Sequence, residues 1–266
     1  MNYNGTYCSG TGDPDALRLI DRSFEMFHAS SELPNLHMNY NDEWDTMCQG
    51  FIWGKGWWIQ NYYGLTYAAT VFLSRRWRNI LQHSLDLFWD RIGDGKRCGA
   101  DSGKVDPKDP RMRSLQFVGP DGCLGDAVVK GGIQYRQGDA RVEIHDWFYE
   151  ATAAGVMMQA ELLLQDHDPE KARKYLPLME RSCAFIEGAR DPRNNLFLVG
   201  PACNLLAPSY GGSFIDGKIG KGYLAGLSVT YIAALSRMKL VYHMTKEEDK
   251  FRAYDRLEKL TRESLK

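Results

Sequence analysis

Apolar side chains recur at three- and four-residue spacing along most of the chain, which is the pattern of α-helices that bury one face. The spacing predicts helices over residues 14–30, 58–73, 74–92, 146–165, 169–188, 221–243 and 246–265. Stretches rich in Gly, Pro and Asp separate them, over residues 31–56, 96–143 and 191–220. Because a long loop without structure of its own is uncommon in a compact domain, we expect short strands in the second stretch, at Gln116–Val118 and Ala127–Val129.

Three of these helices carry start signals. Asp13 precedes Pro14, and Asp168 precedes Pro169. An Asp side chain accepts hydrogen bonds from the first N–H groups of a helix, and Pro fits the first turn. Thr245 is followed three residues later by Glu248, the spacing of a capping box, so we expect Thr245 to cap the last helix.

Six of the predicted helices form three consecutive hairpins, each pairing a fairly apolar helix with a more amphipathic one. The pairs are 58–73 with 74–92, 146–165 with 169–188, and 221–243 with 246–265. A helix that is apolar on nearly all sides lies inside a protein, and an amphipathic helix covers it. The long stretches precede the inner helices or follow the outer ones, so we expect them to gather at one end.

This plan predicts an all-α fold, an α/α toroid of inner and outer helices with long loops at one end. We expect a single domain over residues 1–266. Residues 1–56 would supply an N-terminal helix and an aromatic loop, and residues 57–266 the three hairpins. The alternative is an irregular helical bundle.

The composition is that of a folded globular protein. The chain has 266 residues, of which 44% are hydrophobic and 25% charged, and a net charge of −1. These values exclude a disordered chain. The charge is nearly balanced and there is no basic block, so we do not expect nucleic acid as a partner. The apolar stretches are far shorter than the roughly 20 residues that cross a bilayer, so we do not expect a membrane either.

Cysteine and histidine residues give no sign of a bound metal. The six cysteines and six histidines are scattered without the paired spacing of metal ligands, and we expect no metal and no other cofactor. Residues 1–13 are polar and lack the apolar segment of a signal peptide. We therefore expect either a cytoplasmic chain or one whose signal has been removed.

Aromatic residues concentrate in the polar, Gly-rich residues 40–63. A flat ring stacks on the C–H face of a sugar while neighbouring amides and carboxylates bind its hydroxyls. We therefore expect carbohydrate-binding residues here, namely Trp53, Trp57, Trp58, Asn61 and Tyr62, beside the carboxylates Asp42, Glu43 and Asp45. The alternative is an aromatic core cluster under a loop.

A second polar cluster opens the helix predicted at 146–165. Asp146 and Glu150 lie one helical turn apart, with His145 and Trp147 beside them. Cleavage of a glycosidic bond needs two carboxylates, one as acid and one as base or nucleophile. Glu150 falls where an inner helix is buried, and a buried carboxylate needs either a partner or a function. The alternatives are that Asp146 caps the helix and that His145 is a structural hydrogen bonder.

A third segment supports a resemblance to a known family. Residues 191–200 read Asp-x-x-x-x-Leu-Phe-x-x-Gly between two predicted hairpins. In this respect the chain resembles the six-hairpin glycosidases, the clan of (α/α)6-barrel glycoside hydrolases. A comparable loop in many members ends in Asp-Trp and supplies a catalytic acid, whereas Asn204-Leu205 stands there in this chain. The resemblance implies carbohydrate binding in a central cleft and hydrolysis without a cofactor.

The sequence as a whole predicts a glycoside hydrolase-like protein that cleaves or binds a poly- or oligosaccharide. The candidate catalytic carboxylates are Glu150, Asp146, Asp42, Glu43 and Asp45. The candidate substrate-binding residues are Trp53, Trp57, Trp58, Asn61, Tyr62, His145, Trp147, Asn204 and Tyr210.

Two alternative functions keep the same architecture. One is a polysaccharide lyase, with His145 or Tyr210 abstracting a proton and Arg136 and Arg141 neutralising a uronate. The other is a partial barrel that binds glycans without cleaving them, in keeping with Asn204 in place of an acid. The chain shows about three and a half hairpins of the six in a full barrel, so it would be a piece of a longer protein, an open half-toroid, or a subunit that completes the barrel as a homo-oligomer.

Overall fold

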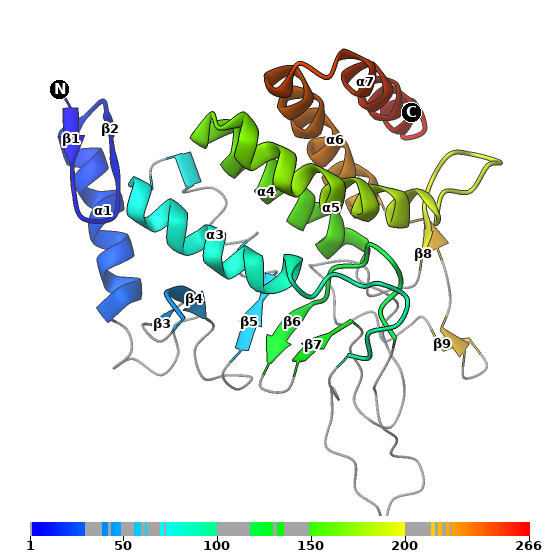
Figure 1. Ribbon diagram of the computed structural model, residues 1–266, viewed down its shortest axis with the longest axis horizontal. Coiled ribbons are helices and arrows are strands. Elements are labelled where there is room, and N and C mark those ends of the chain that lie inside the picture. The colour runs from blue at the N-terminus through cyan, green and yellow to red at the C-terminus, as the bar shows by residue number, and fades with distance from the viewer. Residues whose placement is uncertain are drawn as a thin grey trace, which may run out of the picture. The chain divides into compact units, whose positions relative to one another are not determined.

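Helices dominate the computed structural model of the chain, and the strands are two or three residues long (Figure 1). The structure describes residues 2–29, 39–41, 44–48, 56–59, 62, 70–71, 73–99, 118–129, 132–135, 149–199, 214–215, 218–219, 222–223 and 225–266. The chain folds into two compact units. The first comprises Met1–Phe88 and Ala127–Lys130, and the second comprises Trp89–Asp126 and Gly131–Lys266.

The first unit combines two helices with short antiparallel strand pairs. The helices are α1 (Pro14–Ala29) and α3 (Arg75–Trp89). The strands are β1 (Asn2–Asn4), β2 (Ser9–Thr11), β3 (Asn39–Asn41), β4 (Thr46–Cys48), β5 (Gly56–Trp58) and β6 (Ala127–Val129). They pair as β1 with β2, β3 with β4 and β5 with β6.

One carboxylate of α1 holds the β1–β2 hairpin in place. The backbone N–H groups of Thr6, Tyr7 and Cys8 all donate to Asp21, at 3.2, 2.7 and 2.9 Å. Burial raises the pKa of the Asp21 carboxyl, but these three donors outweigh it and lower the pKa below its usual value. The hairpin thereby covers the core beneath it, where the rings of Tyr7 and Trp77 lie 4.7 Å apart.

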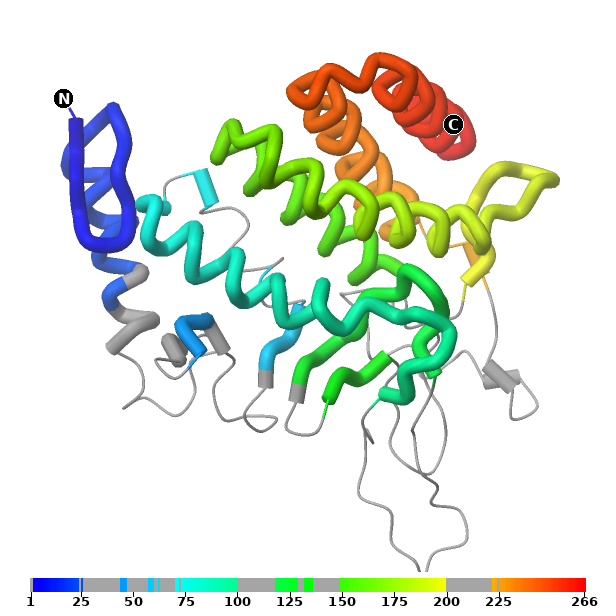
Figure 2. The backbone as a smooth tube through the Cα atoms, viewed as in Figure 1, coloured from blue at the N-terminus to red at the C-terminus, as the bar shows by residue number. Residues whose placement is uncertain are grey.

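The second unit contains four helices: α4 (Tyr149–Asp166), α5 (Pro169–Glu187), α6 (Ala225–Thr245) and α7 (Glu248–Glu263). Its short strands are β7 (Gly132–Gln134), β8 (Leu198–Val199), β9 (Phe214–Ile215), β10 (Lys218–Ile219) and β11 (Gly222–Tyr223). Strand β8 pairs with β11, and β9 with β10. Figure 2 traces the chain from α4 into α5 in green and yellow-green, and from α6 into α7 in orange and red.

Helices α4 and α6 are the inner helices of this unit, and they run parallel. Glu150 and Gly226, each the second residue of its helix, lie side by side, and farther along Glu161 pairs with Arg237 at 2.7 Å. Both helices are apolar on nearly all sides and largely buried, as the sequence predicts. Small residues such as Ala153 and Ala154, both fully buried, allow close approach.

Helices α5 and α7 run back along the inner helices and form the two predicted hairpins. The ring of Tyr149, at the start of α4, stacks on Phe185 near the end of α5 at 4.5 Å, so these two helices are antiparallel. Tyr242, near the end of α6, contacts Tyr254 of α7 at 5.0 Å and donates to Glu180 of α5 at 2.5 Å. The hairpins 146–165/169–188 and 221–243/246–265 are therefore confirmed in their order and pairing, while a toroid stays a prediction.

The helix starts differ in how well the sequence predicts them. Asp13 accepts from the N–H of Asp15 at 2.9 Å, and Asp168 caps α5 through the N–H groups of Glu170 and Lys171. The predicted cap at Thr245 is wrong, because Thr245 is the last residue of α6. Lys246 adopts a positive φ of 63°, which breaks the helix, and Glu247 takes the cap position of α7.

Two helix boundaries are corrected by short strands. The helix predicted from Trp58 does not begin there, because Trp58 lies in β5 and pairs with Ala127 of β6. Most of residues 58–73 lie outside the described residues, and Leu73 forms an isolated bridge with Cys8. Helix α6 begins at Ala225 rather than at 221, because residues 222–223 form β11.

The strands predicted between 96 and 143 are partly described. Ala127–Val129 forms β6 as predicted. Val118 forms an isolated bridge with Cys98, and residues 116–117 lie outside the described residues. None of the helices that the structure describes combines the length and apolar character needed to cross a membrane.

A tight turn at residues 119–123 is hydrogen-bonded to α5. The N–H of Gly122 donates to the carbonyl of Gly93 at 3.0 Å, and Ser182 of α5 donates to the carbonyl of Gly122 at 2.8 Å. Gly122 has a φ of 81°, and a Cβ atom there would lie 2.1 Å from the carbonyl oxygen of Arg181. Only glycine satisfies both constraints.

We predict that Gly122→Ala lowers the free energy of unfolding by at least about 2 kcal/mol, since it combines a strained φ with a backbone clash. Gly95→Ala is the matched control. Gly95 also has a positive φ, 72°, but nothing lies within 4 Å of its Cβ position, so the cost should be about 1 kcal/mol. Chemical denaturation measures both, and equal losses would contradict the packing argument.

Candidate functional site

Glu150 is a buried carboxylate between the first turns of the two inner helices. It is the second residue of α4 and is 3% exposed. The hydroxyl of Thr230, on α6, donates to its Oε1 atom at 3.1 Å. Gly226, one turn earlier on α6, is so close that a Cβ atom there would lie 3.4 Å from Oε2. Both α4 and α6 therefore contribute to the surroundings of this side chain.

The helix directions favour the charged form of this carboxylate. The first N–H groups of a helix have no partner within the helix, and the aligned peptide dipoles place about half a positive charge at its N-terminus. Because α4 and α6 run parallel, both N-termini lie beside Glu150. An anion is stabilised in such a position, which offsets part of the cost of burying it.

Asp191 and Arg193 of the loop after α5 meet Tyr223, which comes just before α6. Arg193 donates from Nε and Nη2 to Asp191, whose side chain is 6% exposed, and the hydroxyl of Tyr223 donates to the same carboxylate. The Arg193 guanidinium, together with Tyr223, holds the pKa of Asp191 well below its usual value. Tyr223 lies in β11 just before α6, and it is 40% exposed.

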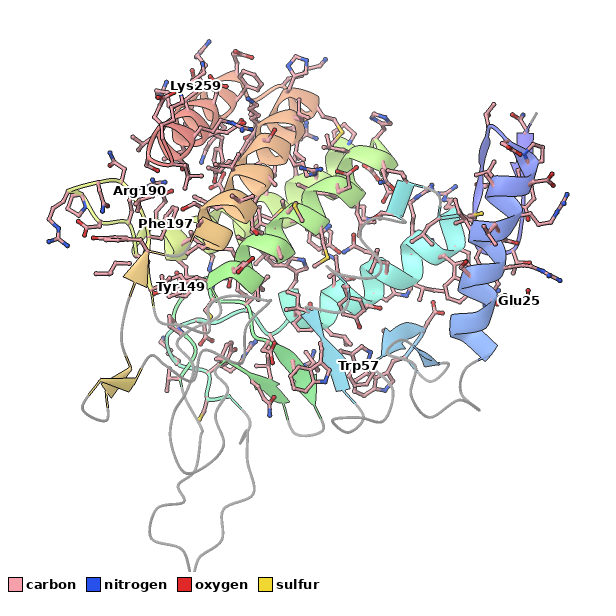
Figure 3. All side chains as sticks on the ribbon, turned by 180° about the vertical axis from the view of Figure 1, so that it is seen from behind. Glu25, Trp57, Tyr149, Arg190, Phe197 and Lys259 are labelled. Atoms are coloured by element: carbon pink, nitrogen blue, oxygen red, sulfur yellow. The ribbon has the colours of Figure 1, made fainter. Side chains whose placement is uncertain are left out.

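The rest of this loop is fixed against α6 and α7. The Arg190 guanidinium lies 4.5 Å from the centre of the Phe197 ring, which meets Tyr231 of α6 edge-on at 5.5 Å. Arg190 also binds Glu187 through two nitrogens, each at 2.7 Å, and Thr261 of α7 at 2.9 Å. Figure 3 labels Tyr149, Arg190 and Phe197 at this end of the unit.

The described aromatic residues of the 40–63 segment lie in the first unit. Trp57 is 8% exposed, donates from Nε1 to Thr46 at 2.9 Å, and stacks on Trp44 with 4.6 Å between centroids. Tyr62 is 1% exposed and meets Phe88 edge-on, and Trp58 is half-buried in β5. Trp44, 44% exposed, is the ring of this stack that reaches solvent.

Asp45 is the one predicted carboxylate of that segment among the described residues. It has a positive φ of 49°, and its Oδ2 atom lies 3.1 Å from Nδ1 of His83. Its side chain is 47% exposed, so water surrounds much of it. Asp45 belongs to the first unit and Glu150 to the second.

Many of the predicted site residues lie outside the described residues. They are Asp42, Glu43, Trp53, Asn61, His145, Asp146, Trp147, Asn204 and Tyr210, together with Arg136 and Arg141 of the lyase alternative. Their predicted roles stay predictions. Within the described part of the chain, no three His, Cys, Asp or Glu side chains are grouped so that they could hold a metal ion.

Sequence reasoning missed the partners of Glu150. Gly226 and Thr230 are one helical turn apart, so they share a face of α6, and this spacing is visible in the sequence. Which helix that face meets is not visible, because the contact joins residues of two separate hairpins. Arg193 and Tyr223 were missed for the same reason.

Comparison with known proteins gives a distant structural similarity. No family model matches the sequence, and neither does any curated protein. Among solved structures, the chain is similar to a rhamnosidase from Klebsiella oxytoca with rhamnose bound, at 13% sequence identity and a TM-score of 0.47. The match covers 79% of this chain and 32% of that one, so the chain spans about a third of the rhamnosidase's length. A similarity of this size assigns no activity to the chain.

We predict that Asp191→Asn destabilises the protein in a pH-dependent manner. Because the pKa of Asp191 is depressed in the folded state, its contribution is complete above the ordinary carboxyl pKa of about 4 and is lost as the pH falls through the folded value. The difference in unfolding free energy between wild type and variant should therefore be constant near neutrality and shrink in acid.

Asp249→Asn serves as the control, because the side chain of Asp249 is 98% exposed and pairs with Arg252 in the same helix. Its effect should be small at every pH. Thermal melts at a series of pH values measure both variants. A loss for Asp191→Asn that grows on acidification would contradict the assigned role.

Proposed function

We propose that the chain is glycoside hydrolase-like and cleaves a poly- or oligosaccharide, with Glu150 as one of its two catalytic carboxylates. The observation that carries the proposal is the placement of Glu150 at the parallel N-termini of two inner helices, 3% exposed and hydrogen-bonded by Thr230. A buried carboxylate is costly, and a core-filling apolar residue would pack there without that cost. A catalytic function explains why the charge is kept.

The chemistry of glycoside cleavage matches what such a carboxylate can do. One carboxyl group protonates the leaving oxygen, and the other acts as base or nucleophile at the anomeric carbon. The N-termini of α4 and α6 and the Thr230 hydroxyl all stabilise the ionised form of Glu150. This favours the second role, base or nucleophile, for Glu150. The acid would then be another predicted carboxylate, such as Asp146, four residues before Glu150 in the sequence.

Aromatic and charged side chains support carbohydrate as the substrate class. The exposed ring of Tyr223 lies just before α6, held by Asp191 and Arg193, and could stack on a sugar at this end of the second unit. The predicted binding residues His145, Trp147, Asn204 and Tyr210 precede α4 and α6 in the sequence and would add to such a surface.

A reducing-sugar release screen across polysaccharides and aryl glycosides tests the proposal. We expect release by the wild type and a fall of at least about 1,000-fold in Glu150→Gln, because the isosteric amide can act neither as base nor as nucleophile. Glu161→Gln is the matched control. Glu161 lies on the same face of α4, paired with Arg237, and its loss should leave release nearly unchanged.

Each of the other outcomes contradicts the proposal in a different way. An ultraviolet-absorbing unsaturated product from a uronate polymer would assign a lyase. Glycan binding by a folded protein without release from any substrate would assign a binding protein. Release that persists in Glu150→Gln would remove Glu150 from the reaction.

A further inference from the structure

Among the described helix hydroxyls, Thr230, like Ser182, donates outside its own helix, and its acceptor is a carboxylate. Ser23, Ser84 and Thr261 each donate to the backbone carbonyl four residues earlier, at 2.9, 2.8 and 2.8 Å. The carbonyl four residues earlier is the local acceptor that a Ser or Thr hydroxyl can reach within a helix. Thr230 instead donates to Oε1 of Glu150 on the neighbouring helix.

A hydroxyl has a single proton to donate, so this bond replaces the local one. Thr230 is 4% exposed, and its χ1 choice is restricted by the branched side chain. Water therefore competes little for the proton, and the hydroxyl is held in place by the surrounding core. A donor fixed in this way restricts rotation of the Glu150 carboxylate to one orientation.

Gly226 lies beside the same carboxylate and adds no atoms to it. A Cβ atom at this position would lie 3.4 Å from Oε2 and 3.5 Å from Oε1, against both oxygens at once. The backbone of Gly226 is helical, with no positive φ that would require glycine. A methyl group at this position would therefore lie in van der Waals contact with the carboxylate, in space that glycine leaves without a side-chain atom.

We infer that Thr230 is a positioning residue that orients the Glu150 carboxylate, and that Gly226 keeps a side chain away from the two carboxylate oxygens. Together these two residues form what we call the carboxylate seat. The inference rests on the proposed function for its consequence in catalysis. The seat itself can be measured without any substrate.

The first test is spectroscopic. In protein labelled with carbon-13 at the glutamate carboxyl groups, the Glu150 signal is assigned by its absence from Glu150→Gln. We expect Thr230→Val, which is nearly isosteric but has no donor, to shift this signal. Thr230→Ser keeps the donor and should restore it. Thr261→Val, which removes a helix hydroxyl elsewhere in the second unit, should leave the Glu150 signal unchanged.

The second test is kinetic, on a substrate found by the release screen. Loss of a hydrogen bond to a charged group should lower kcat about 10- to 100-fold in Thr230→Val with KM little changed, and Thr230→Ser should recover most of it. Gly226→Ala should lower kcat/KM at least about tenfold while the protein stays folded, because its methyl group would occupy the space beside the carboxylate.

The two tests separate failure of the seat from failure of the proposed function. An unchanged Glu150 signal in Thr230→Val overturns the seat, whatever the activity. If the Glu150 signal shifts in Thr230→Val but the wild type shows no glycosidase activity, the seat is supported and the proposed function is overturned. Full activity of Gly226→Ala would overturn the role given to glycine.

Discussion

The parallel packing of α4 against α6 is the constraint on which the second unit depends. Both helices are apolar on nearly all sides, so neither can face water, and each must be enclosed by other helices. The amphipathic helices α5 and α7 supply that cover, and short breaks at His167 and Lys246, each with a positive φ, turn the chain back on itself. The small residues of α4 then allow the two inner helices to approach closely.

The same constraint creates the polar end of the unit. Parallel helices place their N-termini together, and the N–H groups there require polar partners or solvent. In this chain Glu150, Thr230 and the loop containing Asp191 and Arg193 gather at that end. An antiparallel arrangement of the inner helices would have placed a carbonyl end beside Glu150 and opposed its charge. The carboxylate is therefore compatible with only one direction of α6.

The sequence predicts well whatever depends on local pattern. Helices α1, α5 and α7 begin within two residues of the predicted positions, because Asp13 and Asp168 are recognisable caps and the apolar spacing is regular. The burial of Glu150 was predicted because a charged residue in an apolar helix is conspicuous. Strands β5 and β11 were missed because two or three paired residues leave no periodic signal, so Trp58 and Tyr223 were assigned to helices. Thr230 and Gly226 were missed because partners across hairpins are chosen by packing, not by spacing.

The ion pair between Glu161 and Arg237 lies about three helical turns along from the Glu150–Thr230 hydrogen bond, on the same pair of helices. Each contact joins residues at fixed distances from the helix starts, so the two bonds together permit one axial register of α6 against α4. Sliding by a single turn would break both at once. The register is therefore specified twice, so loss of the ion pair alone leaves Thr230 beside Glu150.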